Sequence, residues 1–212
     1  MSYSYIPAIS KLDLEGSMIT LSDPIRRSFG HQTEVIVIDQ KLGYIPIPKN
    51  GSSSIRKMLK DYNIPHLSIY DANNNPAKFF KQFNIPIFTI LRRDAEQRLV
   101  SGIQEYLTRS DLMFNDSLVK NLPLDEHTAY QASYLIGVDL AKLDVFTLDN
   151  LPRLEKYLGQ FIQPVTIPVK NKSAVNDIQS LRQRIIGLTD FKFYLTGEQS
   201  TVDRIIQFKL KK

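Results

Sequence analysis

The 212-residue chain contains no cysteine and no tryptophan. Without cysteine it can form neither a disulfide framework nor a thiolate metal site, and its other side chains suggest no metal site. No apolar run approaches the roughly 20 residues that a membrane helix needs. The first residues also show neither the basic nor the apolar part of a signal peptide. These absences predict a protein without a metal or a membrane partner, and the cytoplasm is its expected location.

The composition is that of an ordinary globular protein, with 42% hydrophobic and 23% charged residues. The formal net charge of +5 suits an anionic ligand, but it is too small to indicate nucleic-acid binding. A chain of this length is expected to form a single domain over residues 1–212. Within it, residues 1–33 show little pattern beyond a possible short strand at 18–21.

Apolar runs alternate with amphipathic segments along the rest of the chain. The predicted strands are residues 34–39, 44–48, 86–91 and 144–148, the first two forming a hairpin. The predicted helices begin near residues 55, 76, 95, 127, 151, 176 and 191. Residues 66–75 and 164–171 are expected to be loops. This order predicts a layered α/β domain with a mainly parallel central sheet flanked by helices.

The most informative stretch joins the second predicted strand to the first predicted helix. The apolar run ends at Pro48, and a loop of small and polar residues follows before the helical pattern begins at Ile55. Such a loop presents backbone N–H groups and a positive helix end to a phosphate, and its lysine adds a charge. We interpret it as an anion cradle; a serine-rich helix cap with an incidental lysine is the alternative. Its members are Lys49, Asn50, Gly51, Ser52, Ser53 and Ser54.

The cradle also contains the glycosylation sequon Asn50-Gly51-Ser52. A glycan at this position would block the loop. The sequon therefore weighs against passage through a eukaryotic secretory lumen.

A second cluster follows the 86–91 strand. Arg93 stands at the strand end, where its guanidinium can form a bidentate fork with a phosphate. Arg98 and Ser101 are three residues apart and share a face of the helix that Asp94 is expected to cap. A surface ion pair of Arg93 with Asp94 or Glu96 is the alternative. Because ligands bind at the carboxyl ends of strands in such sheets, the two clusters are expected to converge on one anion site.

Together the two clusters resemble the sulfotransferases that use 3′-phosphoadenosine-5′-phosphosulfate (PAPS), especially the carbohydrate sulfotransferase branch. In that family a Pro-Lys-x-Gly/Ala-Ser/Thr-Ser loop holds the 5′-phosphosulfate, and Arg-Asp-Pro-x-x-Arg-x-x-Ser holds the 3′-phosphate. This chain keeps both spacings, with Ala95 in place of the proline. Residues 125–131, 144–159 and 169–173 are looser matches. The resemblance covers about residues 34–205.

The resemblance implies a P-loop-like three-layer domain that moves a sulfuryl group from PAPS to a hydroxyl of a carbohydrate or small metabolite. The transfer would be an in-line displacement without a metal, and Lys49 would stabilise the leaving phosphate. The donor-binding residues that it implies are Lys49, Asn50, Gly51, Ser52, Ser53, Ser54, Arg93, Arg98, Ser101, Lys172 and Ser173.

The acceptor hydroxyl needs a general base, for which histidine is suited. His127 and His66 are the candidates, with Glu105 and Asp71 as carboxylate alternatives. His127 lies four residues before Gln131 on a predicted helix, so both side chains are expected to face one cleft. The acceptor and the oligomeric state are not predicted.

Two other function classes remain open. A P-loop-like nucleotide kinase or NTPase would use the 34–39 strand as a Walker-B-like element, but it needs Mg²⁺ and a Gly-Lys-Ser/Thr loop that this chain lacks. A non-catalytic anion-binding protein would keep the fold without the chemistry.

Overall fold

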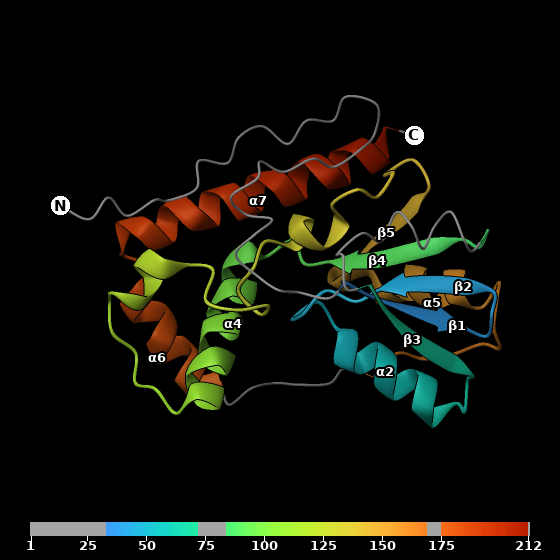
Figure 1. Cartoon of the computed structure of the whole chain (residues 1–212), viewed down its shortest axis with the longest axis horizontal. Coiled ribbons are helices and arrows are strands. Elements are labelled where there is room, and N and C mark those ends of the chain that lie inside the picture. Colours follow the sequence, from blue (N-terminus) through green and yellow to red (C-terminus); the bar gives the residue numbers. More distant parts are fainter. Residues whose placement is uncertain (1–32, 72–83, 169–174, 212) are drawn as a thin grey trace.

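The structure, a computed structural model, describes residues 33–71, 84–168 and 175–211. It shows an α/β arrangement in which helices flank a five-stranded sheet with the order β3-β1-β2-β4-β5 (Figure 1). The strands are β1 (Thr33–Ile38), β2 (Leu42–Ile45), β3 (His66–Asp71), β4 (Ile87–Leu91) and β5 (Leu143–Thr147). The α-helices are α2 (Ser52–Asp61), α4 (Ala95–Ser110), α5 (Leu151–Leu158), α6 (Val175–Ile185) and α7 (Thr189–Leu210). Three short 3₁₀ helices are η2 (Leu118–Asn121), η3 (Gln131–Leu135) and η4 (Leu148–Asn150).

The predicted elements at 18–21 and 76–83 lie outside the described residues, as do the candidate site residues Lys172 and Ser173.

The sheet is mixed, so the prediction of a mainly parallel sheet is wrong. β2, β4 and β5 run parallel to one another, whereas β1 runs antiparallel to both β2 and β3. The predicted hairpin of β1 and β2 is confirmed, and its turn places Asp39 and Gln40 at positive φ, as hairpin turns require. β3 replaces a predicted loop. Its pairing with β1 supplies backbone hydrogen bonds that the mixed polar sequence His66–Asp71 does not reveal.

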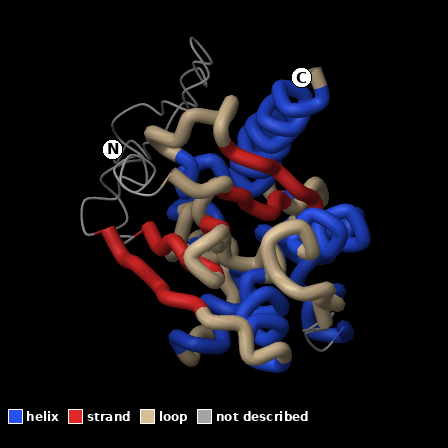
Figure 2. The backbone as a smooth tube through the Cα atoms, turned by 90° about the vertical axis from the view of Figure 1, so that its right-hand side faces the viewer, coloured by secondary structure: helices blue, strands red, loops and turns tan. Residues whose placement is uncertain are grey.

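Both faces of the sheet are buried. Val35 and Val37 of β1 point into one core, and Ile36 and Ile38 point into the other. The first core is covered by α7 and the segment 129–140, and the second by α2 and α5 (Figures 1 and 2). The continuous β-branched run of β1 is therefore buried on both sides, as its sequence predicts.

A third core joins α4, α6 and the first half of α7 beside the sheet (Figure 1). The predicted start of α4 is confirmed, since the Asp94 carboxylate accepts the Gln97 N–H at 2.8 Å. The helix predicted from residue 127 is instead a turn followed by the short η3. Among the described helices, none has the length and apolar character that a bilayer crossing requires.

Candidate active site

The loop that we interpret as an anion cradle follows β2 and leads into α2, in the predicted order of strand, loop and helix. After β2 the chain turns through Lys49, with φ of 66°, and Gly51, with φ of 82°. Gly51 is the N-cap of α2, and a Cβ on it would lie 2.8 Å from Cδ2 of Leu148. The left-handed backbone and this close approach both demand glycine at the turn. Among the described residues no side chain caps the N-terminus of α2, and the Ser54 N–H donates to the Gly51 carbonyl at 2.9 Å. The N–H groups before it have no acceptor within the helix.

Asn50 holds the cradle onto the sheet. Its side chain is fully buried, and Nδ2 donates to the Ile90 carbonyl at 2.8 Å and to Gln131 Oε1 at 2.6 Å. Asn50 was predicted to bind the cofactor, but its side chain instead links the loop to β4 and Gln131. The same burial keeps the sequon asparagine out of reach of glycosylation in the folded protein.

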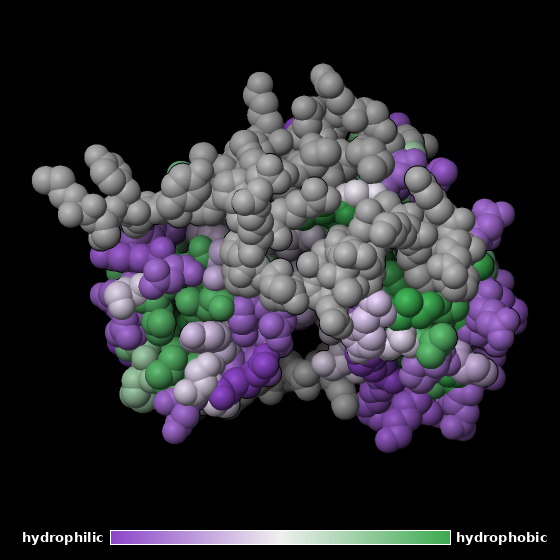
Figure 3. All heavy atoms as spheres, in the orientation of Figure 1, coloured by the Kyte–Doolittle hydropathy of each residue, from purple (hydrophilic) through white to green (hydrophobic). Residues whose placement is uncertain are grey.

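A cavity of about 760 Å³ opens between the cradle, α4 and the turn at residues 125–128. Figure 3 shows a hollow with a hydrophilic rim between the helical part and the sheet part of the molecule. The volume lies in the range of ligand pockets in general. Polar lining comes from Lys49, Gly51, Ser52, Ser53, Ser54, Arg92, Ser101, Glu105, Glu126 and His127. Apolar lining comes from Pro48, Ile55, Ile90, Leu148, Leu151 and Ile167.

Lys49 supplies the positive charge at the cradle end of this pocket. Its side chain is 18% exposed, and Nζ lies 3.2 Å from Oε2 of Glu105 on α4. Together with the uncapped end of α2, this ammonium makes the cradle side attractive to an anion. An anionic ligand there would compete with Glu105 for Lys49.

The residues of the second cluster, Arg93, Arg98 and Ser101, do not all reach the pocket. Ser101 lines the pocket, but Arg93 does not: it forms an ion pair with Asp149 at 3.5 Å. Arg93 instead lines a separate cavity of about 110 Å³, together with Arg153 and Lys209.

The neighbouring Arg92, which the sequence reasoning passed over, lines the main pocket. Its guanidinium donates to the Lys49 carbonyl at 3.4 Å and to Gln97. Burial lowers the pKa of Arg92, although a guanidinium stays charged near neutral pH. The strand alternation carried a signal for it, since Arg92 is in phase with Phe88 and Ile90, which face α2.

Arg98 is buried in the protein interior and cannot reach a ligand in the pocket. Its side chain is 0% exposed, and Nη1 lies 3.2 Å from Oε1 of the equally buried Glu198 on α7. Burial raises the pKa of Glu198, while Arg98 and hydrogen bonds from Gln131 oppose that shift. The predicted phosphate contact of Arg98 is thus replaced by an internal ion pair that joins α4 to α7.

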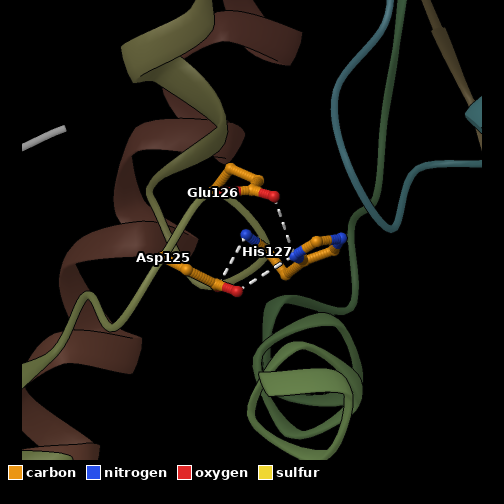
Figure 4. A group of neighbouring side chains, drawn as sticks. All are labelled: Asp125, Glu126 and His127. Atoms are coloured by element: carbon orange, nitrogen blue, oxygen red, sulfur yellow. Dashed lines mark hydrogen bonds and ion pairs between the residues drawn. The ribbon is translucent and has the colours of Figure 1, made fainter. Parts of the chain in front are cut away.

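His127 reaches the pocket from a turn (Figure 4). The Asp125 carboxylate accepts hydrogen bonds from the His127 backbone N–H at 2.9 Å and from Nδ1 at 3.1 Å. Burial by itself would raise the pKa of Asp125, but these bonds from His127 outweigh it and lower the pKa. With its proton on Nδ1, the neutral ring has its Nε2 lone pair free, and Figure 4 shows that second nitrogen pointing away from both carboxylates.

Gly102 allows the His127 turn to approach α4. A Cβ on Gly102 would lie 2.4 Å from the His127 carbonyl oxygen. No side chain fits at that distance, so glycine at this helical position places His127 over the pocket.

Asp125, Glu126 and His127 offer three potential metal-ligand atoms within 4.8 Å of one another. However, Nη1 of Arg109 lies 3.1 Å from Glu126 Oε1 and 3.2 Å from His127 Nδ1. This guanidinium already brings a positive charge to the group, and we assign no ion to it.

The other base candidates lie elsewhere, apart from Glu105. His66 begins β3 next to Ile38, at the end of the sheet opposite the cradle, so its predicted role as base is wrong. Its Nδ1 lies 2.9 Å from the Ile64 carbonyl oxygen. Asp71 ends β3 at the sheet edge, and its side chain is not described. The expected common face of His127 and Gln131 does not form, because Gln131 is fully buried.

No protein-family model, no curated protein and no solved structure matches this chain. The assignment of a function therefore depends on the residues of the pocket.

Proposed function

We propose that the protein is a PAPS-dependent sulfotransferase that acts on a hydroxyl group. One observation carries the proposal: a single pocket is lined by Lys49, the cradle serines, Ser101 and His127. In the sequence, Ser54 at the end of the first motif and Ser101 at the end of the second are 47 residues apart. Their convergence is what a donor with two phosphate groups requires.

The cradle is the proposed site of the 5′-phosphosulfate, in a P-loop-like arrangement of β2, loop and α2. Lys49, Ser52 and Ser53 would contact it together with the N-terminus of α2. Arg92 and Ser101, which line the same pocket, would hold the 3′-phosphate. The motif itself assigns the 3′-phosphate to Arg93. To reach the pocket, the Arg93 side chain would have to break its ion pair with Asp149.

The chemistry is an in-line displacement at sulfur. The acceptor oxygen forms a bond to sulfur as the bond from sulfur to the bridging phosphate oxygen breaks, and the electron pair stays on that oxygen. Lys49 would stabilise the negative charge that develops there. Nε2 of His127 would take the hydroxyl proton, with Asp125 orienting the ring and stabilising its charged form.

Glu105 is the second candidate base, because its carboxylate already lies in the pocket. A donor bound at Lys49 would free this carboxylate from its ion pair. His127→Gln and Glu105→Gln distinguish the two candidate bases. The variant that lacks the true base loses sulfuryl transfer while retaining its affinity for adenosine 3′,5′-bisphosphate.

The proposal is tested by isothermal titration of the full chain with adenosine 3′,5′-bisphosphate. We expect micromolar binding that Lys49→Ala and Ser101→Ala weaken, whereas Lys57→Ala has no effect because Lys57 pairs with Asp61 on α2. Comparing Arg92→Ala with Arg93→Ala decides which arginine holds the 3′-phosphate. If the wild type does not bind adenosine 3′,5′-bisphosphate in the micromolar range, the proposal is wrong.

A second assay separates the function classes. Incubation with PAPS and a panel of sugars and small hydroxyl compounds should yield a sulfated product. Bisphosphate binding without transfer to any of them would indicate a non-catalytic anion-binding protein, and magnesium-dependent ATP turnover would indicate a nucleotide kinase or NTPase.

A further inference from the structure

We infer that Gln131 is a positioning residue that holds the two anion-binding segments of the pocket at a fixed separation. The inference rests on the proposed function, since the segments are those assigned to the two phosphates of the donor. It concerns a residue that does not itself line the pocket.

The Gln131 side chain contacts both segments at once. Oε1 accepts from Asn50 Nδ2 at 2.6 Å and from the Arg92 backbone N–H at 2.8 Å. Nε2 donates to the Arg92 carbonyl at 3.1 Å. The amide thus pairs with both backbone groups of Arg92, in the manner of a neighbouring strand residue, just where β4 ends. Its remaining bond reaches into the middle of the cradle.

Gln131 is itself held in place by α7. Its backbone N–H lies 3.2 and 3.1 Å from the two carboxylate oxygens of Glu198. Glu198 is in turn paired with Arg98, and all three residues are fully buried. A chain of buried polar groups therefore runs from α7 through Gln131 to the cradle and to the end of β4.

This arrangement has a mechanical consequence for a two-phosphate ligand. Asn50 lies between Lys49 and Gly51, and Arg92 precedes the helix that carries Ser101, so one amide sets the distance between both anion-binding ends. The bonds from Gln131 to Asn50 and Arg92 are buried, where a hydrogen bond is stronger than in water and restrains the groups that it joins. Elsewhere in the network, Asn50 Oδ1 and two guanidinium nitrogens of Arg98 have no hydrogen-bond partner among the described residues. A ligand that spans both ends gains affinity from this fixed spacing, whereas a ligand that uses only the cradle does not.

Gln131→Met tests the inference, because methionine keeps the volume and removes both hydrogen-bonding functions. Asn50→Ala is the second variant, and it breaks the same link from the cradle side. Thr201→Val is the matched control. Its hydroxyl is buried on α7 and donates to the Gly197 carbonyl at 2.9 Å, within the helix and away from the cradle.

Two readouts are needed, and the first requires no ligand. Hydrogen exchange should become faster at the amides of residues 49–54 and at the Arg92 amide in both Gln131→Met and Asn50→Ala, and remain unchanged in Thr201→Val. If Gln131→Met exchanges like Thr201→Val at these sites, the inference is wrong.

The second readout compares adenosine 3′,5′-bisphosphate with adenosine 5′-monophosphate by titration. We expect both variants to lose roughly tenfold in bisphosphate affinity and less than about threefold in monophosphate affinity. Equal losses for the two ligands would overturn the positioning role. If the wild type binds neither nucleotide, the proposed function fails, and the exchange data still decide whether Gln131 holds the two segments together.

Discussion

The cradle and the cluster after β4 look equally persuasive as sequence motifs, yet they reach the pocket to different extents. In the cradle, Lys49 and the three serines line the cavity, and only Asn50 turns inward. In the second cluster Ser101 lines it, Arg98 is buried and Arg93 faces another cavity. The cradle is one tight turn, whose shape follows from neighbouring residues. The second cluster spreads over a strand end and two helical turns, where distant segments decide which way a side chain points.

Arg98→Met has the largest expected effect and breaks the buried half of the second cluster. The substitution leaves Glu198 buried without its ion-pair partner, so we expect a loss of about 3–5 kcal/mol in the free energy of unfolding. Urea denaturation measures this loss. Arg93→Met is the control: it breaks only the exposed pair with Asp149 and should cost about 0–1 kcal/mol. Similar costs for both variants would contradict the split between the two arginines.

Lys49→Ala has the next largest expected effect and tests the cradle. Loss of the charge at the leaving oxygen should slow the proposed sulfuryl transfer from PAPS to an acceptor hydroxyl about 10²–10³-fold, with the stability of the fold retained. The sulfated product formed over time gives the rate. Lys57→Ala, which removes a lysine of α2 that pairs with Asp61, should match the wild type. A Lys49→Ala variant with wild-type rate would remove Lys49 from the mechanism.

Gly102→Ala tests how α4 supports His127 in the same pocket. The added methyl group would lie 2.4 Å from the His127 carbonyl oxygen, so the turn at residues 125–128 must move away. We expect about 1–3 kcal/mol of destabilisation, together with slower sulfuryl transfer. Thermal unfolding and transfer assays report the two effects. The control is Gly187→Ala, which meets nothing within 4 Å and should be close to neutral.

The smallest expected effect is a difference in pH dependence between the buried Glu198 and the partly buried Asp125. The folded-state pKa of Glu198 is raised above its ordinary value of 4.5, so the folded chain keeps a proton that the unfolded chain loses. Its contribution to stability therefore declines as the pH rises from 4.5 through the folded pKa. The pKa of Asp125 is lowered from 3.8, so its stabilising contribution is present above that pH and is lost as the pH falls through the folded pKa.

Melting temperatures measured between about pH 3 and 8 test these two opposite pH dependences. Glu198→Gln should remove the fall in melting temperature above the ordinary pKa of glutamate. Asp125→Asn should remove the fall in melting temperature at acid pH, and each substitution should alter the curve by about 2–4 °C. The shape of the profile is the measurement, since Glu198→Gln also weakens the pair with Arg98. Unchanged profile shapes in both variants would show that neither carboxyl carries the assigned shift.

Much of the fold was readable from local patterns. The β-branched run of β1, the strand, loop and helix at the cradle, and the Asp94 cap of α4 each follow from adjacent residues. β3 was not predicted, because its short sequence mixes polar residues with Leu67, Ile69 and Tyr70, and it forms a strand by pairing with β1. The predicted hairpin already makes β1 antiparallel to β2, and β3 extends that antiparallel half of the sheet by a pairing that the sequence did not predict.

The candidate site divides in the same way. The sequence by itself determined the shape of the cradle, since glycine at a left-handed turn and a lysine before it are local properties. Strand alternation already favoured Arg92 over Arg93 for the pocket. Only the tertiary structure decided that Arg98 is buried in an ion pair with Glu198, and that Gly102 lets the His127 turn lie close to α4. The physical reason is that a side chain's direction depends on the charge and space that distant segments offer it. Glu198 is 100 residues from Arg98, and no local pattern records that pairing.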